Sequence, residues 1–106
     1  MDFEITPEET KQKLASGEAK LLDVREPWEH QTARIEGAKL IPMGEVPARA
    51  HQELDPEAHV IVYCHHGRRS LDVTNWLRQQ GYDKVQSMRG GIDAWSRKVD
   101  PKVPTY

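Results

Sequence analysis

Short apolar runs that alternate with helical patterns constrain the fold of this 106-residue chain more than any other feature. The clearest run is 59–63, where three β-branched residues and a tyrosine follow a turn-like Asp-Pro pair and predict a strand. Weaker runs predict strands at 20–24, 38–41 and 85–88. Apolar runs without polar alternation are typical of strands that are buried on both faces. The sequence therefore predicts an α/β fold with a mainly parallel central sheet flanked by helices on both faces.

Glycine and proline mark the ends of the helical segments between these runs. The segment Thr6-Pro7-Glu8-Glu9 combines an N-cap threonine, proline at the first helical position and glutamate three residues after the cap, and Gly17 marks the stop. Further helices are predicted from about Pro47 to Leu54, from Ser70 toward Gly81 and after Gly90-Gly91. The stretch after Pro27 is predicted to be a loop, and residues 100–106 to be extended.

Composition limits the size of the core and the kind of partner. Hydrophobic residues make up 37% of the chain, enough for one modest core, so we expect residues 1–106 to form one domain. The 15 Lys and Arg against 17 Asp and Glu give a net charge of −2, which does not favour nucleic acid or an anionic membrane. No apolar run approaches the roughly 18–20 residues that span a bilayer, and the first residues do not resemble a secretory signal. We expect a cytoplasmic protein. The residues do not separate a monomer from a dimer, and a monomer is the working expectation.

The one cysteine, Cys64, comes directly after the 59–63 strand. A single thiol excludes an internal disulfide and any site that needs several thiolates. Ligands of open parallel sheets bind where strands end and the next helices begin, which is where Cys64 lies. The segment reads Cys64-His65-His66-Gly67-Arg68-Arg69-Ser70 and contains two arginines, two histidines and no acid.

Four features of this segment favour the thiolate form of Cys64. The next helix directs unpaired N–H groups and the positive end of its dipole toward the segment. The two arginines add positive charge, and the two histidines add charge or hydrogen bonds. Gly67 allows a turn whose successive N–H groups bind an anion. Such surroundings lower the pKa of a cysteine from about 8.5 to about 3.5–7.5. We therefore expect Cys64 to be a nucleophile.

The same residues also have structural interpretations. A lone cysteine at the end of an apolar strand is often an inert core residue, and Ser70 caps its helix as readily as it contacts the reactive sulfur. A metal site at Cys64 and the two histidines is disfavoured, because consecutive side chains are expected to diverge and no second ligand pair is evident. We expect no metal and no cofactor. Asp23 and Arg25 are interpreted as an exposed ion pair at a strand end that supports the site. No role is assigned to His30, His51 or His59.

The segment around Cys64 resembles the active-site loop of the rhodanese family of sulfurtransferases, in which a strand, Cys-x-x-Gly-x-Arg-Ser and a helix follow one another. Residues 22–29, Leu-Asp-Val-Arg-Glu-Pro-Trp-Glu, are similar to the family's Asp-Val-Arg-Glu signature, and residues 90–95 to its Gly-Gly-x-x-Ala-Trp motif. Residues 34–38 occupy the place of its His-Ile-Pro-Gly-Ala segment, with arginine and glutamate at the histidine and proline positions. Residues 99–104 resemble the tails of single-domain members. Several motifs in the same order are more specific than the cysteine segment alone.

The resemblance implies a small rhodanese-like domain that transfers sulfur. Cys64 would take sulfane sulfur from a small anionic donor such as thiosulfate, form a persulfide, and pass the outer sulfur to cyanide or a thiol, including a thiol on a protein. Binding of the anion and the persulfide is assigned to His65, His66, Gly67, Arg68 and Arg69, with Ser70, Asp23 and Arg25 as supporting residues. His65 stands where many family members carry arginine.

Two other functions remain open from the sequence. A carrier or redox-sensitive interaction module would hold the persulfide without turnover, since one small domain leaves little room for an acceptor site. An arsenate or phosphate-ester enzyme would use a similar loop. Protein phosphatases use Cys-x5-Arg, whereas Arg69 follows Cys64 as Cys-x4-Arg. The shorter loop favours sulfur over phosphate.

Overall fold

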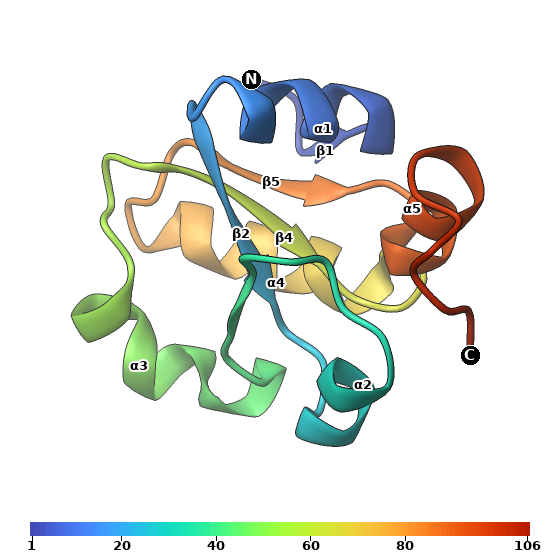
Figure 1. Ribbon diagram of the computed structural model, residues 1–106. Helices are drawn as coiled ribbons and strands as arrows, with labels where there is room; N and C mark the ends of the chain where they lie inside the picture. Colours follow the sequence, from blue (N-terminus) through green and yellow to red (C-terminus); the bar gives the residue numbers. More distant parts are fainter.

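Five parallel strands form one sheet in the computed structural model, which describes residues 1–106 (Figure 1). The strand order is β1-β5-β4-β2-β3, and every neighbouring pair is parallel. The strands are β1 (Glu4–Ile5), β2 (Ala19–Asp23), β3 (Lys39–Leu40), β4 (His59–Tyr63) and β5 (Val85–Met88). The predicted α/β fold with a parallel sheet is confirmed.

Five α-helices and one short 3-10 helix connect or follow the strands. They are α1 (Pro7–Ala15), α2 (Pro27–Thr32), η1 (Met43–Glu45), α3 (Val46–Glu53), α4 (Arg68–Gln79) and α5 (Gly91–Lys98). The predicted capping box at α1 is present, because Thr6 Oγ1 accepts the Glu9 N–H at 3.1 Å and the Glu9 carboxylate accepts the Thr6 N–H at 3.3 Å.

Helices cover both faces of the sheet, as predicted (Figure 1). Leu22 and Val62 belong to a buried cluster on the face covered by α3 and α4. Leu21 and Ile61 belong to a second buried cluster on the opposite face, with side chains of α5. Successive residues of a strand point to opposite faces, so the unbroken apolar runs of β2 and β4 supply both cores.

Three details differ from the prediction. The stretch after Pro27 is α2 rather than a loop, because proline occupies the first helical position and the Glu29 carboxylate accepts the Glu26 N–H at 3.0 Å. Helix α4 begins at Arg68 instead of Ser70, which places both arginines in its first turn. The two-residue strand β1, which pairs with β5, is absent from the prediction, and so short a strand leaves little apolar pattern to read.

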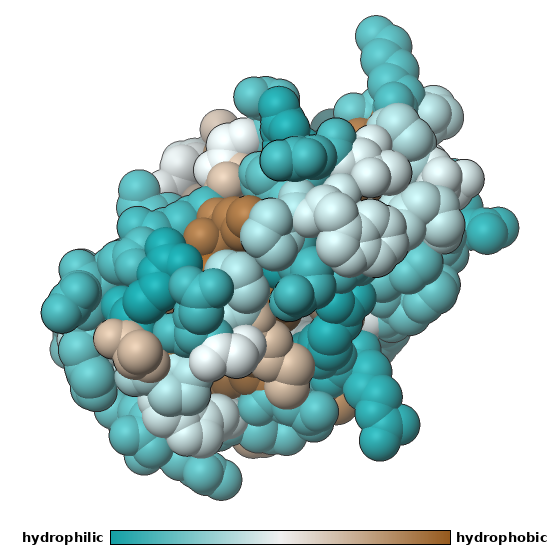
Figure 2. Space-filling model, turned by 90° about the horizontal axis from the view of Figure 1, so that it is seen from below, coloured by the Kyte–Doolittle hydropathy of each residue, from teal (hydrophilic) through white to brown (hydrophobic).

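Figure 2 shows the face on which α2 and α3 lie as mostly hydrophilic, with small apolar patches separated by polar side chains. No helix combines the length and the apolar character that crossing a bilayer requires.

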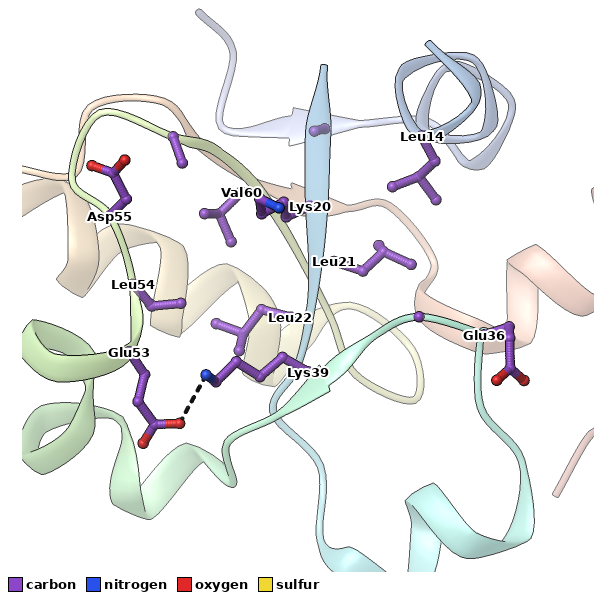
Figure 3. A pocket seen from close by; sticks show the side chains of 13 residues that line it. Leu14, Lys20, Leu21, Leu22, Glu36, Lys39, Glu53, Leu54, Asp55 and Val60 are labelled. Carbon is purple, nitrogen blue, oxygen red and sulfur yellow. Dashed lines mark ion pairs between the residues drawn. The ribbon is translucent and has the colours of Figure 1, made fainter. Parts of the chain in front are cut away.

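A groove of about 690 Å³ runs along β2 from Ala19 to Leu22, between α1 and residues 53–58 (Figure 3). Leucines line much of it, and an ion pair between Lys39 and Glu53 crosses one side at 3.1 Å. Cys64 follows the end of β4, and the parallel strands β2 and β4 begin together at the groove. No residue of the segment 64–70 lines the groove.

Candidate active site

The side chain of Cys64 lies against the first turn of α4. Cys64 follows β4 directly and is only 1% exposed. Its Sγ accepts hydrogen bonds from the backbone N–H groups of Gly67 at 3.1 Å and Ser70 at 3.3 Å. Two N–H donors and the positive end of a helix dipole all favour a negative charge on the atom that they face. The turn from Cys64 into α4 is therefore suited to hold an anionic sulfur.

Gly67 and Ser70 shape this turn. Gly67 has φ of 105°, in the left-handed region, and a Cβ there would lie 3.2 Å from the Gly90 backbone nitrogen. Ser70 is fully buried, and its Oγ lies 3.4 Å from Cys64 Sγ and donates to the Gly67 carbonyl at 3.2 Å. Gly67, not Ser70, occupies the N-cap position of α4. Of the two sequence interpretations of Ser70, contact with the sulfur-bearing side chain is the one that the geometry supports.

The first residues of α5 hold the same turn from the other side. The N–H groups of Ile92 and Asp93 donate to the carbonyls of Cys64 at 2.9 Å and His65 at 3.1 Å. Gly91 has φ of 63°, and a Cβ on it would collide with both carbonyls, lying 2.5 Å from the Cys64 oxygen. The Gly90-Gly91 pair therefore does more than turn the chain from strand to helix. It lets the backbone of α5 approach the Cys64 turn closely enough to bond to it.

Asp23 and Arg25 form a fully buried ion pair at the end of β2. Arg25 donates to the two Asp23 carboxylate oxygens at 2.7 Å and 2.9 Å and to the Ala33 carbonyl at 2.7 Å. Burial opposes ionisation of Asp23, but hydrogen bonds from Arg25 and His30 outweigh it and hold the pKa of Asp23 below its usual value. The expectation of an exposed pair is wrong because α2 and the segment after it cover the pair. His30, to which no role was assigned, lies 2.9 Å from Asp23.

We expect Arg25→Met to destabilise the fold by about 3–5 kcal/mol, because it leaves the buried Asp23 carboxylate without its partner. Urea unfolding followed by circular dichroism measures the change. The double variant Asp23→Asn/Arg25→Met removes both charges and should recover part of the loss. Lys13→Met, which breaks the exposed ion pair with Glu18, is the control and should change the midpoint little. A midpoint for Arg25→Met as close to the wild type as that of the control would contradict the prediction.

The first turn of α4 places its two arginines differently. Arg69 donates to both carboxylate oxygens of Glu29, at 2.8 Å and 3.0 Å, whereas Arg68 is exposed. The sequence analysis found no acid beside the arginines because Glu29 lies 40 residues away in sequence and reaches them only through α2. The hydrogen bonds from Arg69, together with one from Tyr106, lower the pKa of Glu29 to about 2. The charge of Arg69 is therefore balanced by a carboxylate.

Tyr106, in the segment that follows α5 (red in Figure 1), also reaches this cluster. Its hydroxyl donates to Glu29 Oε2 at 2.6 Å and accepts from Arg25 Nη1 at 2.8 Å. Its ring stacks on His65, with centroids 3.9 Å apart and planes at 7°. The exposed Trp28 ring lies nearly perpendicular to the Tyr106 ring, with centroids 5.9 Å apart. The sequence analysis gave Tyr106 no role.

His65 and His66 also stack on each other, with centroids 3.9 Å apart and planes at 27°. The prediction that their side chains diverge is wrong, and potential ligand atoms of His65, His66 and Asp93 lie within 4.8 Å of one another. Asp93 already pairs with Arg97 at 3.0 Å. A metal ion bound by all three residues would compete with Arg97 for the Asp93 carboxylate. Burial and the neighbouring His66 lower the pKa of His65, which favours the neutral form of His65.

Comparison with known proteins assigns the family. Residues 6–98 match the family model of the rhodanese-like domain. The chain belongs to the rhodanese-like family. It is 41% identical over 101 residues to a sulfurtransferase of Allochromatium vinosum, and the match covers 94% of each chain. It is 40% identical over 98 residues to YrkF of Bacillus subtilis, whose name describes a sulfur carrier protein, covering 92% of this chain and 52% of that one.

Solved rhodanese-like structures have the same fold. The human single-domain sulfurtransferase TSTD1 superposes with a TM-score of 0.87 at 28% identity, covering 92% of this chain and 98% of that chain. Other relatives are longer. The chain matches 31% of the length of a chloroplastic rhodanese-like/PpiC domain-containing protein of Arabidopsis thaliana, at 45% identity over 92 residues that make up 84% of this chain. It therefore spans about a third to a half of two of its curated relatives.

The rhodanese-like fold gathers the predicted site residues from two places in the sequence. The segment 64–70 and the Asp23–Arg25 pair lie at the same ends of the parallel strands β4 and β2. The sequence analysis missed Glu29, Tyr106 and the α5 amides. Proline and glutamate around residue 29 carry a helix-start signal that would have revealed α2, whereas nothing near Tyr106 in the sequence indicates its contacts.

Glu29 should make the stability of this rhodanese-like fold depend on pH. Its pKa in the fold is about 2 against an ordinary value of 4.5, so its ionised form stabilises the fold above about pH 4.5 and the contribution is lost as the pH falls toward 2. We expect up to about 3 kcal/mol. The free energies of unfolding of wild type and Glu29→Gln, measured in urea, should therefore differ at about pH 5 and become equal as the pH falls to about 2. Glu36→Gln, at an exposed carboxylate, is the control. A constant gap between wild type and Glu29→Gln would refute this assignment.

Proposed function

We propose that this rhodanese-like chain is a sulfurtransferase that works through a persulfide on Cys64. The donor is a small anion that carries sulfane sulfur, of the thiosulfate class, and the acceptor is cyanide or a thiol. The observation that carries the proposal is the sulfur of the one cysteine, which accepts N–H bonds from Gly67 and Ser70 at the start of α4. Relatives named as a sulfurtransferase and a sulfur carrier support it.

The proposed reaction consists of two displacements on sulfur. The Cys64 thiolate attacks the sulfane sulfur of thiosulfate, so that a new S–S bond forms while the S–S bond of thiosulfate breaks and sulfite leaves with the electron pair. Cyanide or a thiolate then attacks the outer sulfur of the persulfide, and the Cys64 thiolate leaves with that electron pair. Atoms and electrons balance in both steps without an external oxidant.

The surroundings of Cys64 suit negative charge at each stage. The Gly67 and Ser70 N–H groups face the sulfur, and we assign them to the thiolate and the persulfide. Arg68 and His66 are exposed beside the turn, and we assign them to the incoming anion. Arg69, which pairs with Glu29, is assigned to the same anion, while Asp23 and Arg25, which α2 covers, support the site. Because Cys64 is 1% exposed, its reaction partners must be narrow or must present sulfur on an extended arm.

The proposal takes residues 1–106 as one domain that acts as a monomer in the cytoplasm. The cytoplasmic location rests on the sequence alone, and the Arabidopsis relative is named chloroplastic.

Intact-protein mass spectrometry tests the proposed function. After exposure to thiosulfate and desalting, the protein should be heavier by one sulfur atom, and added cyanide should restore the original mass and release thiocyanate. A wild-type protein that gains no sulfur over a wide range of thiosulfate concentrations would overturn the proposal.

A persulfide carrier is the second candidate function. The sulfur-carrier name of one relative and the low exposure of Cys64 favour it. A carrier would load one sulfur per chain but would form thiocyanate only negligibly with cyanide, and would react slowly with small thiols. Sulfur loading and steady-state thiocyanate formation, measured on one preparation, separate a carrier from an enzyme.

A further inference from the structure

Tyr106 links two charged groups that belong to different elements. Its hydroxyl lies between Arg25, which follows β2, and Glu29 in α2, at 2.8 Å and 2.6 Å. Arg25 is fully buried and Glu29 is 4% exposed, so water has little access to either group. A phenol both donates and accepts, and here it donates to the carboxylate while it accepts from the guanidinium. The hydroxyl therefore fixes Glu29 relative to the buried Asp23–Arg25 pair.

Glu29 in turn binds Arg69 through two hydrogen bonds. The Glu29 carboxylate accepts four hydrogen bonds: two from Arg69, one from Tyr106 and one from the Glu26 backbone N–H. Its Oε2 accepts from both Arg69 and Tyr106. Arg69 lies in α4 between Gly67 and Ser70, whose N–H groups bond to Cys64 Sγ. Hydrogen bonds to Glu29 raise the pKa of Arg69, so its guanidinium stays charged, and the next residue, Ser70, donates its backbone N–H to Cys64 Sγ at 3.3 Å.

The ring of Tyr106 contacts the Cys64 turn at a different residue, His65. It stacks on His65, the residue next to Cys64 in the chain, with planes at 7°. The ring of Tyr106 therefore contacts the residue that follows Cys64, while its hydroxyl is linked to Arg69 only through Glu29.

We propose that Tyr106 is a positioning residue for sulfur uptake that acts through Glu29 to hold Arg69 beside Cys64. The inference rests on the proposed sulfurtransferase function and adds a residue to it. Tyr106 bonds to no atom of Cys64, and its effect is to orient a cation toward the dianionic donor and the departing sulfite. Thiosulfate and the departing sulfite each carry two negative charges, whereas cyanide carries one, so a fixed cation stabilises sulfur uptake more than transfer to cyanide.

Tyr106→Phe tests the inference, because it keeps the ring and removes the hydroxyl. Each half-reaction is measured alone by mass spectrometry: loading from thiosulfate below saturation, and unloading by cyanide. Loading should slow about tenfold, equivalent to about 1.4 kcal/mol, while unloading changes less than about twofold. Tyr82→Phe removes the hydroxyl of a buried tyrosine in the core cluster on the α3 and α4 face, and it should leave both rates unchanged.

A double-mutant cycle identifies the route of the effect. If Tyr106 acts through Glu29, adding Tyr106→Phe to Glu29→Gln should slow loading no further, and full additivity would overturn the inference. Arg69→Lys keeps the charge but loses the paired hydrogen bonds, so it should slow loading at least as much as Tyr106→Phe. The inference would also be overturned if Arg69→Lys loaded sulfur at the wild-type rate. The same holds if Tyr106→Phe lowered the stability of the fold but loaded sulfur at the wild-type rate. If wild type itself gains no sulfur, the proposed function fails instead.

Discussion

Cys64→Ser is expected to abolish sulfur uptake from thiosulfate and all transfer to cyanide. Cys64 is the only cysteine of the chain, so no other thiol can replace it. A serine hydroxyl is a far weaker nucleophile toward sulfur than a cysteine thiolate. The Gly67 and Ser70 N–H groups, which bond to Cys64 Sγ, would still have an acceptor in the serine oxygen. The variant should therefore fold as the wild type does.

Mass spectrometry before and after thiosulfate measures this effect, with circular dichroism as the check on folding. Ser87→Ala is a matched control, because it alters a buried hydroxyl 2.7 Å from Ser70 Oγ and leaves the thiol in place. It should still gain one sulfur. A folded Cys64→Ser protein that gains sulfur would show that uptake does not depend on the thiol.

Gly91→Ala is expected to destabilise the fold more than any other substitution near the site that adds one methyl group. Gly91 has φ of 63°, and a Cβ there would lie 2.5 Å from the Cys64 carbonyl oxygen and collide with His65 as well. The neighbouring atoms are backbone, so no side-chain rotation relieves the clash. Strain at a left-handed residue together with displacement of the Cys64 turn should cost about 3 kcal/mol or more. Sulfur loading by the protein that remains folded should fall at least about tenfold, because displacing groups around a reacting atom by about 1 Å costs more than that.

Gly44→Ala is the matched control for this prediction. Gly44 lies in η1, has no positive φ and has open space where a Cβ would stand. Its replacement should change the free energy of unfolding by about 1 kcal/mol or less and leave loading unchanged. Urea unfolding and sulfur-loading rates, measured for Gly91→Ala and Gly44→Ala, test this prediction. Equal stability of the two variants would mean that the α5 backbone does not need glycine to approach Cys64.

Most of the secondary structure could be predicted from local signals. The strand at 59–63 matches β4 residue for residue, and the capping box at Thr6 marks the start of α1. A similar helix-start signal lies at Pro27 and Glu29, but the prediction for this stretch is a loop. Without α2, the sequence gives no reason to place the Glu29 carboxylate beside Arg69. The site prediction was therefore strongest where its residues are consecutive, from Cys64 to Ser70, and weakest where a side chain comes from another element.

The sequence by itself determined the parallel α/β core, the place of Cys64 at the end of a buried strand and the resemblance to the rhodanese family. These features depend on apolar periodicity, on glycine and proline, and on short motifs, all of which act over a few residues. Only the tertiary structure decided that Asp23 and Arg25 are buried, that Glu29 pairs with Arg69 across 40 residues, and that Tyr106 bonds to Arg25 across 81. Contacts of that kind form because the packed elements exclude water and bring distant charges together, and no local pattern in the chain encodes them.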